Sequence, residues 1–216
     1  MTTLPPPADQ AERLIELGVP ALLGQNPDAV REAATALGSP APGLLVTEAA
    51  RTHLDELVPL ICREGQRGFI VEDFVDTADF VPVSGLDPSP ITLPDGWYWL
   101  EDPRRGDEFE NASPAEAWEQ IVAANRVPLT AAEGVFWLLQ QPDTLERNHC
   151  FMTVGSRKPR PRGGYDSRTP ALWISNGTGR DGSDRKNAPK LGWCWWNNRH
   201  TWLGIAHAAA RHPAQP

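Results

Sequence analysis

The segment from Arg147 to Gly204 decides the fold, and it contains RNHCFMTVGSR (147–157), PALWIS (170–175) and KLGWCWWNNRHTWLG (190–204). Each stretch includes a short apolar run rich in aromatic and branched residues: 150–154, 171–175 and 191–196. Runs of this length, separated by loops of Arg, Gly and Pro, predict β-strands. Five of the nine tryptophans lie in this segment. We therefore expect a Trp-rich C-terminal meander of antiparallel strands.

Two capping boxes mark the clearest helices. Ser113-Pro114-Ala115-Glu116 and Thr130-Ala131-Ala132-Glu133 each place a Glu three residues after a Ser or Thr, so that side chains satisfy the free amides of a helix start. They predict helices that run to about Asn125 and through Leu139. Weaker apolar spacing predicts further helices over 9–17, 26–37, 72–80 and 201–211, and strands over 43–47 and 97–100.

These elements predict an α+β fold class, with an antiparallel sheet and helices packed on one face. We expect one domain over residues 9–212. Its first part, 9–146, is acidic and mostly helical, and its second part, 147–212, holds the basic Trp-rich sheet. The proline-rich start, residues 1–8, predicts a disordered tail.

The composition is that of an ordinary globular protein, with 40% hydrophobic and 22% charged residues. The three cysteines, Cys62, Cys150 and Cys194, are widely spaced and form no CxxC pair, so neither a disulfide framework nor a zinc ribbon is indicated. No apolar run approaches the roughly 20 residues that span a bilayer, and the start lacks a signal-peptide pattern. We expect a cytoplasmic protein without membrane association, cofactor or bound metal.

Charge is distributed unevenly along the chain. From Arg147 onward there are 12 Lys and Arg against 3 Asp and Glu, and the totals of 20 and 28 leave 8 against 25 before it. Such asymmetry is typical of a surface that binds an anionic partner or polyanion. Alternatively, the acidic and basic parts complement each other inside one folded domain.

Several motifs resemble those of a family of actinobacterial proteins of unknown function. They are ELGVPALLG (16–24), LTAAEG (129–134), RNHCFMTVGSR (147–157), PALWIS (170–175) and KLGWCWWNNRHTWLG (190–204). The resemblance covers most of the chain. It implies no activity, so it supplies no catalytic residues.

Cysteine and histidine near the predicted sheet raise the question of a metal or nucleophile site. Cys150 and Cys194 could approach each other if their strands are adjacent, with His149 and His200 nearby. However, consecutive residues of a strand point to opposite faces, so His149 and Cys150 cannot both line one site. Buried core cysteines explain the pattern more simply. His200 and Cys150 are the catalytic candidates.

A GxGxxG pattern over Gly177–Gly182 follows a predicted strand. A dinucleotide site needs a helix directly after this pattern, to hold the pyrophosphate. Ser183–Pro189 is a poor helix former. The pattern therefore indicates a hairpin loop.

The basic loops are the predicted ligand-binding surface. Loop 156–169 holds Arg157, Arg160 and Arg162, and guanidinium groups match phosphate and carboxylate geometry. The polar turn 197–201 contains Arg199 and His200 and precedes a predicted helix, whose free amides favour anions. An exposed Trp196 beside these groups could stack on a ring.

Three functions remain open from the sequence. The first is a non-catalytic binding domain for an anionic small molecule or polyanion. The second is a small hydrolase or transferase that uses His200 or Cys150. The third is a protein-interaction module with an exposed tryptophan patch.

Overall fold

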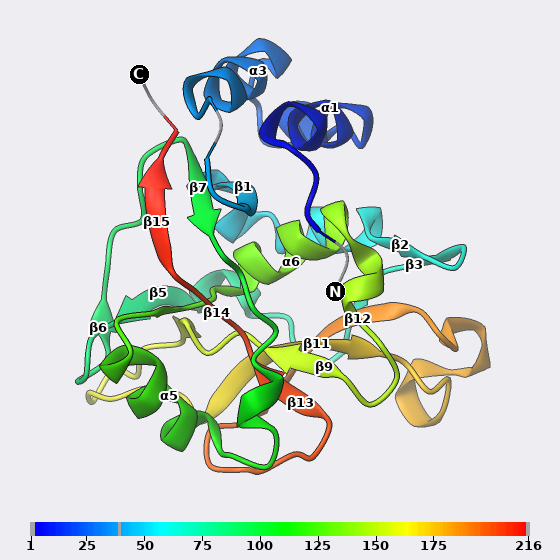
Figure 1. Cartoon of the computed structure of the whole chain (residues 1–216). Helices are drawn as coiled ribbons and strands as arrows, with labels where there is room; N and C mark the ends of the chain where they lie inside the picture. Colours follow the sequence, from blue (N-terminus) through cyan, green and yellow to red (C-terminus); the bar gives the residue numbers. More distant parts are fainter. Residues whose placement is uncertain (1–2, 39, 215–216) are drawn as a thin grey trace.

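The computed structural model describes residues 3–38 and 40–214 and shows helices and sheets in stacked layers (Figure 1). The α-helices are α1 (Pro7–Glu16), α2 (Val19–Leu22), α3 (Pro27–Ala36), α4 (Leu54–Leu57), α5 (Pro114–Ala123) and α6 (Ala131–Gln140). The strands are β1 (Gly43–Thr47), β2 (Cys62–Arg63), β3 (Gln66–Arg67), β4 (Phe69–Ile70), β5 (Val81–Ser84), β6 (Ser89–Pro90), β7 (Trp97–Glu101), β8 (Val127–Pro128), β9 (Cys150–Met152), β10 (Ser156–Arg157), β11 (Arg168–Ile174), β12 (Pro189–Trp195), β13 (Leu203–Ile205), β14 (His207–Ala208) and β15 (Ala210–Pro213). The predicted α+β class is confirmed.

Two sheets organise these strands. Sheet A has the order β1-β7-β15, with antiparallel neighbours. Sheet C has the order β13-β9-β11-β12-β4. Its strands β9, β11 and β12 are antiparallel, as expected for the Trp-rich meander, whereas the edge strands β13 and β4 pair in parallel. Smaller ladders join β10-β5-β6, β14-β8 and β2-β3.

Helix α6 lies at the centre, between sheet A and sheet C (Figure 1). Every residue of α6 is buried. Gly134 permits its close approach to sheet C, because a Cβ there would lie 2.7 Å from Leu172 Cδ1 and 2.7 Å from Thr153 Cγ2. Both predicted capping boxes are present, at the starts of α5 and α6. The fold is therefore layered around one buried helix.

Helices α1 and α3 cover the other side of sheet A (Figure 1). Strand β1 is an edge strand, so its outward backbone groups need other partners. The buried side chain of Gln10 supplies them: Nε2 donates to Gly43 O at 2.9 Å, and Oε1 accepts from Leu45 N at 2.9 Å. This amide joins α1 to sheet A.

A buried ion pair fixes α6 to sheet A. Arg211 of β15 donates to Glu133 Oε1 at 2.5 Å and to Glu133 Oε2 at 2.8 Å, and Tyr98 of β7 donates to Glu133 at 3.0 Å. Burial alone would raise the pKa of Glu133, but the charge of Arg211 and the hydrogen bonds outweigh burial and lower it. Glu133 is thus ionised in the core.

Two predicted helices are wrong. Residues 201–211 form β13, β14 and the start of β15, because a continuous buried run over 203–208 pairs with β9 and β8 instead of presenting one apolar face. Residues 72–80 form turns with one short 3-10 helix, Thr77–Asp79. There Phe74 and Phe80 pack edge to face at 5.1 Å, which gives both rings burial without a helix.

The N-terminal boundary also differs from the expected one. Helix α1 begins at Pro7, within the segment expected to be a tail, and Leu4 packs against the core. Met1 and Thr2 lie outside the described residues. The expected strand 43–47 matches β1, and 97–100 matches β7 to within one residue.

Candidate functional site

A tight hairpin connects α6 to sheet C. Glu146 and His149 exchange backbone hydrogen bonds of 3.1 Å in both directions, so Arg147 and Asn148 form a two-residue turn. Asn148 has a φ of 65°, a left-handed conformation that asparagine tolerates better than most residues. The turn therefore projects Arg147 and Asn148 beyond the edge of β9.

These two residues line a cleft of about 460 Å³ together with side chains of sheet C. The other lining residues are Cys150 of β9, Trp173 and Ile174 of β11, and Asn176 and Trp202 in the adjoining loops. We call this the Trp cleft. Its volume falls within the range of small-molecule sites, which is about 300–1,000 Å³.

The Trp cleft is electrostatically positive. Arg147 makes no ion pair among the described residues, and the hydrogen bond of its guanidinium recorded there goes to the side-chain oxygen of Asn187. None of the residues that line the cleft is acidic. Beside it, Lys190 Nζ lies 4.8 Å from the centre of the Trp173 ring and pairs with Asp181. A guanidinium without an ion pair, in a cleft that two indole rings also line, suits a planar anion.

The buried residue Arg105 holds the hairpin in place. Its Nη1 donates to Thr144 O at 2.9 Å, to Glu146 Oε1 at 3.0 Å and to His149 O at 3.2 Å. These bonds reach both sides of the Arg147-Asn148 turn. Arg105 is thus a support for the cleft, although its own side chain does not line it.

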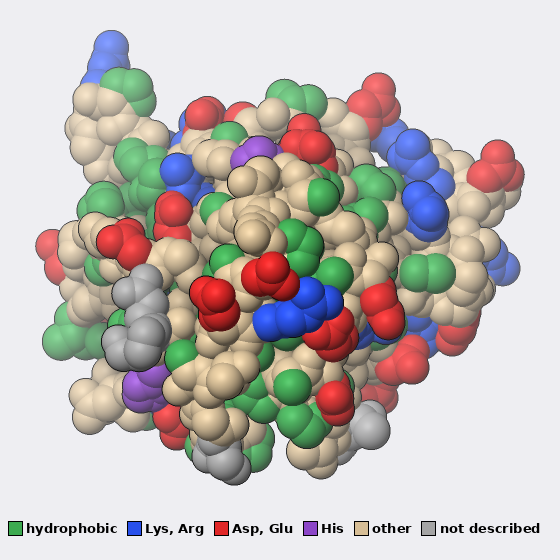
Figure 2. Space-filling view, turned by 90° about the horizontal axis from the view of Figure 1, so that it is seen from above, with side chains coloured by type: hydrophobic (Ala, Val, Ile, Leu, Met, Phe, Trp, Pro, Cys, Tyr) green, Lys and Arg blue, Asp and Glu red, His purple; other side chains and the backbone are tan. Residues whose placement is uncertain are grey.

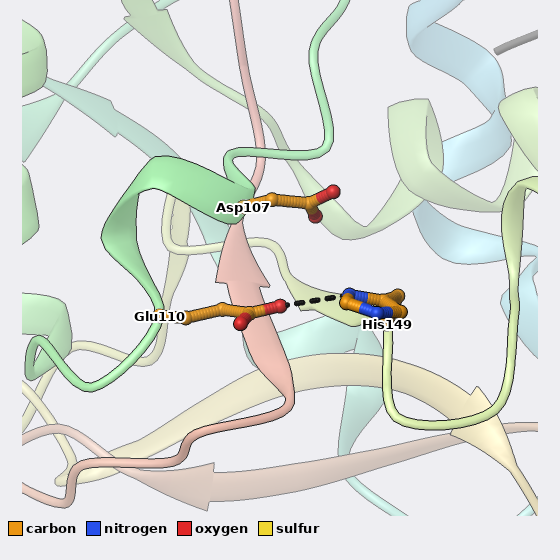
Figure 3. A group of neighbouring side chains, drawn as sticks. All are labelled: Asp107, Glu110 and His149. Atoms are coloured by element: carbon orange, nitrogen blue, oxygen red, sulfur yellow. Dashed lines mark hydrogen bonds and ion pairs between the residues drawn. The ribbon is translucent and has the colours of Figure 1, made fainter.

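Next to this support lies the one group of three described residues with metal-ligand spacing: Asp107, Glu110 and His149 (Figure 3). Their ligand atoms lie within 4.8 Å of one another, and His149 Nδ1 is 3.0 Å from Glu110 Oε1. However, Arg105 donates to both oxygens of Asp107, at 2.7 and 2.6 Å. Since this guanidinium already balances the Asp107 charge, the group fits a hydrogen-bonded cluster better than a cation site.

Cys150 lies in the Trp cleft as a neutral thiol. Its Sγ donates to Glu146 O at 3.4 Å, and burial raises the pKa of the thiol to about 11. The strands of Cys150 and Cys194 are not adjacent, because β11 lies between β9 and β12 and Cys194 is opposite Thr169, so the two cysteines do not form the joint site considered from the sequence. Cys150 therefore lacks the low pKa of a cysteine nucleophile.

His200 lies near the cleft, against one of its walls. Its ring packs edge to face on Trp202, with centroids 5.5 Å apart, and its buried Nε2 has no partner among the described residues. Burial lowers the pKa of His200. The polar turn 197–201 precedes β13 and not a helix, so the expected helix amides are missing there.

The predicted basic ligand-binding residues lie apart from this cleft. Arg157 is only 4% exposed, and its guanidinium stacks 3.6 Å from the Trp196 ring and donates to Asp166 O at 2.8 Å. Burial lowers the pKa of Arg157 to about 10. Arg199 pairs with Glu116. Roles of these residues in ligand binding stay predictions.

Arg160 and Arg162 lie on an exposed hairpin tip between β10 and β11. The structure gives them no ion pair among the described residues. They do not face the Trp cleft, which Arg147 supplies with positive charge instead. Their part in binding an anion stays a prediction as well.

Ion pairs connect the basic segment to the acidic one. Lys158 and Arg168 both bind Asp76, at 2.8 and 2.6 Å, and Arg180 binds Asp73 at 3.1 Å. Together with Arg199–Glu116 and Arg211–Glu133, these pairs cross the boundary at Arg147. Internal complementarity thus accounts for much of the charge asymmetry.

Comparison with known proteins gives a family but no function. A model of a family of unknown function (DUF5701) matches residues 13–214, so the chain belongs to that family. No curated protein and no solved structure shows significant similarity to it. No helix within the described ranges is long and apolar enough to cross a membrane. The actinobacterial origin that the motifs suggest stays a prediction.

Proposed function

We propose that this member of the family binds a small anionic molecule with a planar ring in the Trp cleft. One observation carries the proposal: Arg147, without an ion pair among the described residues, shares a cleft with two indole rings and no acidic residue. The guanidinium would hold the anionic group in a charge-assisted bidentate contact. Trp173 and Trp202 would take the ring by stacking.

The two asparagines supply the polar contacts that would orient such a ligand. Asn148 and Asn176 lie at the exposed rim of the cleft. Each side-chain amide offers both donors and an acceptor. A ring with polar edges, such as a nucleobase, would suit these groups and the stacking surfaces together.

A binding role fits the chemistry of the cleft better than catalysis. The Cys150 thiol has a pKa raised to about 11, so it is protonated near neutral pH and is a poor nucleophile. No hydrogen bond joins Cys150 to His200 in the described part of the chain. The Trp cleft therefore offers no activated nucleophile for the alternative function of a hydrolase or transferase.

Isothermal titration calorimetry with AMP and adenosine tests the proposal. We expect Arg147→Gln to weaken AMP binding at least tenfold, because a hydrogen bond to a charged group contributes about 1.5–3 kcal/mol and about 1.4 kcal/mol is a factor of ten. Adenosine, which lacks the anionic group, should bind more weakly than AMP and should respond little to the substitution.

Arg162→Gln is the matched control, since Arg162 is also exposed and without an ion pair but lies outside the cleft. Its AMP affinity should equal that of the unchanged protein. If Arg162→Gln lost affinity for AMP and Arg147→Gln did not, the binding site would lie at loop 156–169 and not in the Trp cleft. Equal affinity for AMP and adenosine would show that the anionic group does not contribute to binding.

We also infer that the domain works in the cytoplasm. Cys62, Cys150 and Cys194 are all free thiols, as expected in a reducing compartment. Fractionation of the native cells, followed by immunodetection of the chain, tests this inference directly.

A further inference from the structure

The imidazole of His207 in β14 is buried, and both of its ring nitrogens have partners. The residue is 2% exposed, Arg126 Nε donates to His207 Nδ1 at 2.5 Å, and His207 Nε2 lies 2.9 Å from Glu108 Oε1. A guanidinium only donates hydrogen bonds, so Nδ1 is the unprotonated acceptor. Nε2 therefore carries the ring proton and donates it to Glu108. These contacts hold His207 neutral in one tautomer.

Charged side chains from the segments packed against His207 surround it. They are Glu108 in a 3-10 helix, Arg126 just before β8, and Asp102 and Arg104 in the loop after β7. Burial lowers the pKa of His207; Glu108 opposes this effect, and the charges of Arg126 and Arg104 add to it. Since the ordinary value is 6.5, His207 is neutral at pH 7.5 and takes a second proton only below pH 6.5.

Protonation of His207 would disrupt its contact with Arg126. Nδ1 would carry a hydrogen that points at the Nε–H group of Arg126, and two cations would face each other across 2.5 Å. Repulsion between like charges is strong where water is excluded. Arg126 also donates to Asp102, to Oδ2 at 2.9 Å and to the backbone O at 2.7 Å. A displaced Arg126 would therefore release Asp102.

Asp102 begins segment 102–110, which carries Arg105, the support of the Trp cleft. Asp102 has a φ of 46°, and a residue other than glycine keeps such a conformation only where surrounding contacts hold it. Arg104 exchanges backbone hydrogen bonds with His207, at 2.8 and 3.1 Å, so Arg105 directly follows the residue that pairs with His207. Loosening of this segment would reach the hairpin, because the Arg105 guanidinium bonds to both sides of its turn.

We propose that the contact between His207 and Arg126 is a pH-sensitive support of the Trp cleft. Protonation of Nδ1 displaces Arg126, loosens segment 102–110 and weakens the hold of Arg105 on the hairpin. The affinity of the cleft for an anion with a planar ring then falls with the pH. This last step rests on the proposed function of the cleft, whereas the loosening of the hairpin does not depend on it.

Amide hydrogen exchange, followed by nuclear magnetic resonance, tests the loosening without a ligand. The His149 amide, which donates to Glu146 O at 3.1 Å, reports on the hairpin. Its protection, the ratio of the intrinsic to the measured exchange rate, should fall at least about fivefold from pH 7.5 to pH 5, the lower end of ordinary coupling between sites. The Leu45 amide is the reference, because it donates to Gln10 Oε1 beneath the face that carries α1 and α3 (Figure 2). Its protection should change much less, and equal changes at the two amides would overturn the inference.

Calorimetry with cyclic AMP tests the effect on the cleft. Its phosphodiester keeps one negative charge over this pH range, whereas a phosphate monoester such as AMP gains a proton at about pH 6. The affinity for cyclic AMP should be at least about fivefold lower at pH 5 than at pH 7.5. Equal affinity at both pH values would refute the pH-sensitive support. Failure to bind at pH 7.5 would contradict the proposed function instead, and the hairpin exchange would still decide whether His207 supports the hairpin.

Two variants assign the responses to one histidine. His207→Gln should abolish both pH responses, because a glutamine amide does not titrate, whether or not it restores the two hydrogen bonds. His53→Gln is the matched control and should keep them, since His53 also pairs with a glutamate, Glu56 at 3.0 Å, but is only partly buried and lies just before α4. Responses that persist in His207→Gln would belong to another group, such as His149 or His200, and would refute the proposal.

The unchanged protein decides the matter if His207→Gln does not fold. Long-range ¹H–¹⁵N correlation spectra of the imidazole should show His207 Nδ1 without a proton at pH 7.5 and with one at pH 5. A protonated Nδ1 at pH 7.5, or an unprotonated one at pH 5, would show that His207 is not the pH-sensitive group.

Discussion

The ion pair beneath sheet A and the ion pairs on the loops of sheet C differ in their exposure to water. Beneath sheet A, Glu133 is fully buried and pairs with Arg211 and Tyr98 inside the core. Around sheet C, the pairs made by its strands, Arg168–Asp76 and Lys190–Asp181, are partly buried, whereas both side chains of the loop pair Arg180–Asp73 are largely exposed. A buried charge must stay paired, whereas an exposed one can exchange its partner for water. The loops of sheet C are therefore the region in which charge can be free to meet a ligand.

The largest expected effect is on the buried pair. Arg211→Met should lower the free energy of unfolding by about 3–5 kcal/mol, because it leaves the Glu133 carboxylate buried without its counter-ion. Arg180→Met should change it by no more than about 1 kcal/mol, since exposed pairs contribute little. Urea denaturation measures both. Similar losses in the two variants would abolish the distinction between the sheets.

A double substitution sharpens that comparison. Arg211→Met combined with Glu133→Leu removes both charges, so much of the stability lost in the single variant should return. If the double variant is no more stable than Arg211→Met, the loss comes from packing and not from the unpaired charge.

The next effect concerns the thiols. The pKa of Cys150 is raised by burial from 9.0 to about 11, which lowers the thiolate fraction about 100-fold near neutral pH. Cys62 is exposed. Iodoacetamide at pH 8, followed by mass spectrometry, should therefore label Cys62 long before Cys150. Labelling of both at one rate would contradict the buried, neutral thiol in the Trp cleft.

The smallest effect is the pH response of an ion pair beside sheet C. Hydrogen bonds from Arg168, helped by Lys158 and opposed by burial, lower the pKa of Asp76 from 3.8 to about 2. Asp76 therefore stabilises the fold above pH 3.8, and this contribution is lost as the pH falls towards 2. Because the site is partly open to water, we expect less than about 1 kcal/mol.

Asp76→Asn tests that response. Urea midpoints at pH 5 and pH 2.5 should differ less in Asp76→Asn than in the unchanged protein, since the variant has no carboxyl group to protonate there. An identical pH response in both proteins would show that Asp76 is not the group concerned.

Sequence patterns predicted correctly the helices whose starts are stabilised by residues within a single turn. The capping boxes at Ser113 and Thr130 gave α5 and α6 because cap and Glu lie in the same turn. Residues 201–211 were expected to be a helix because apolar spacing describes one segment alone. Their pairing with β9, β8 and β7 depends on partners far away in the sequence.

The Trp cleft was harder to predict for the same reason. The polar turn 197–201 beside this cleft was predicted to bind a ligand, but Arg147 and Asn148 have no local signal beyond a turn between apolar segments. Their position depends on Arg105, which lies 42 residues earlier than Arg147 in a charged stretch without a motif. Arg157 is the opposite case: the sequence predicted that it binds a ligand, but its guanidinium stacks on Trp196. An arginine-rich loop does not reveal which of its arginines is buried in this way.

The last strands of the chain impose an order on folding. Strand β13 forms one edge of sheet C and β15 forms one edge of sheet A, and both come from residues 203–213. Before that segment leaves the ribosome, β9 and β7 each expose an unpaired edge, which can pair with other chains. Pairing over such long sequence separations is slow. Until residues 203–213 have been synthesised, nascent chains are therefore prone to aggregate through these two edges, and this one segment then covers both of them.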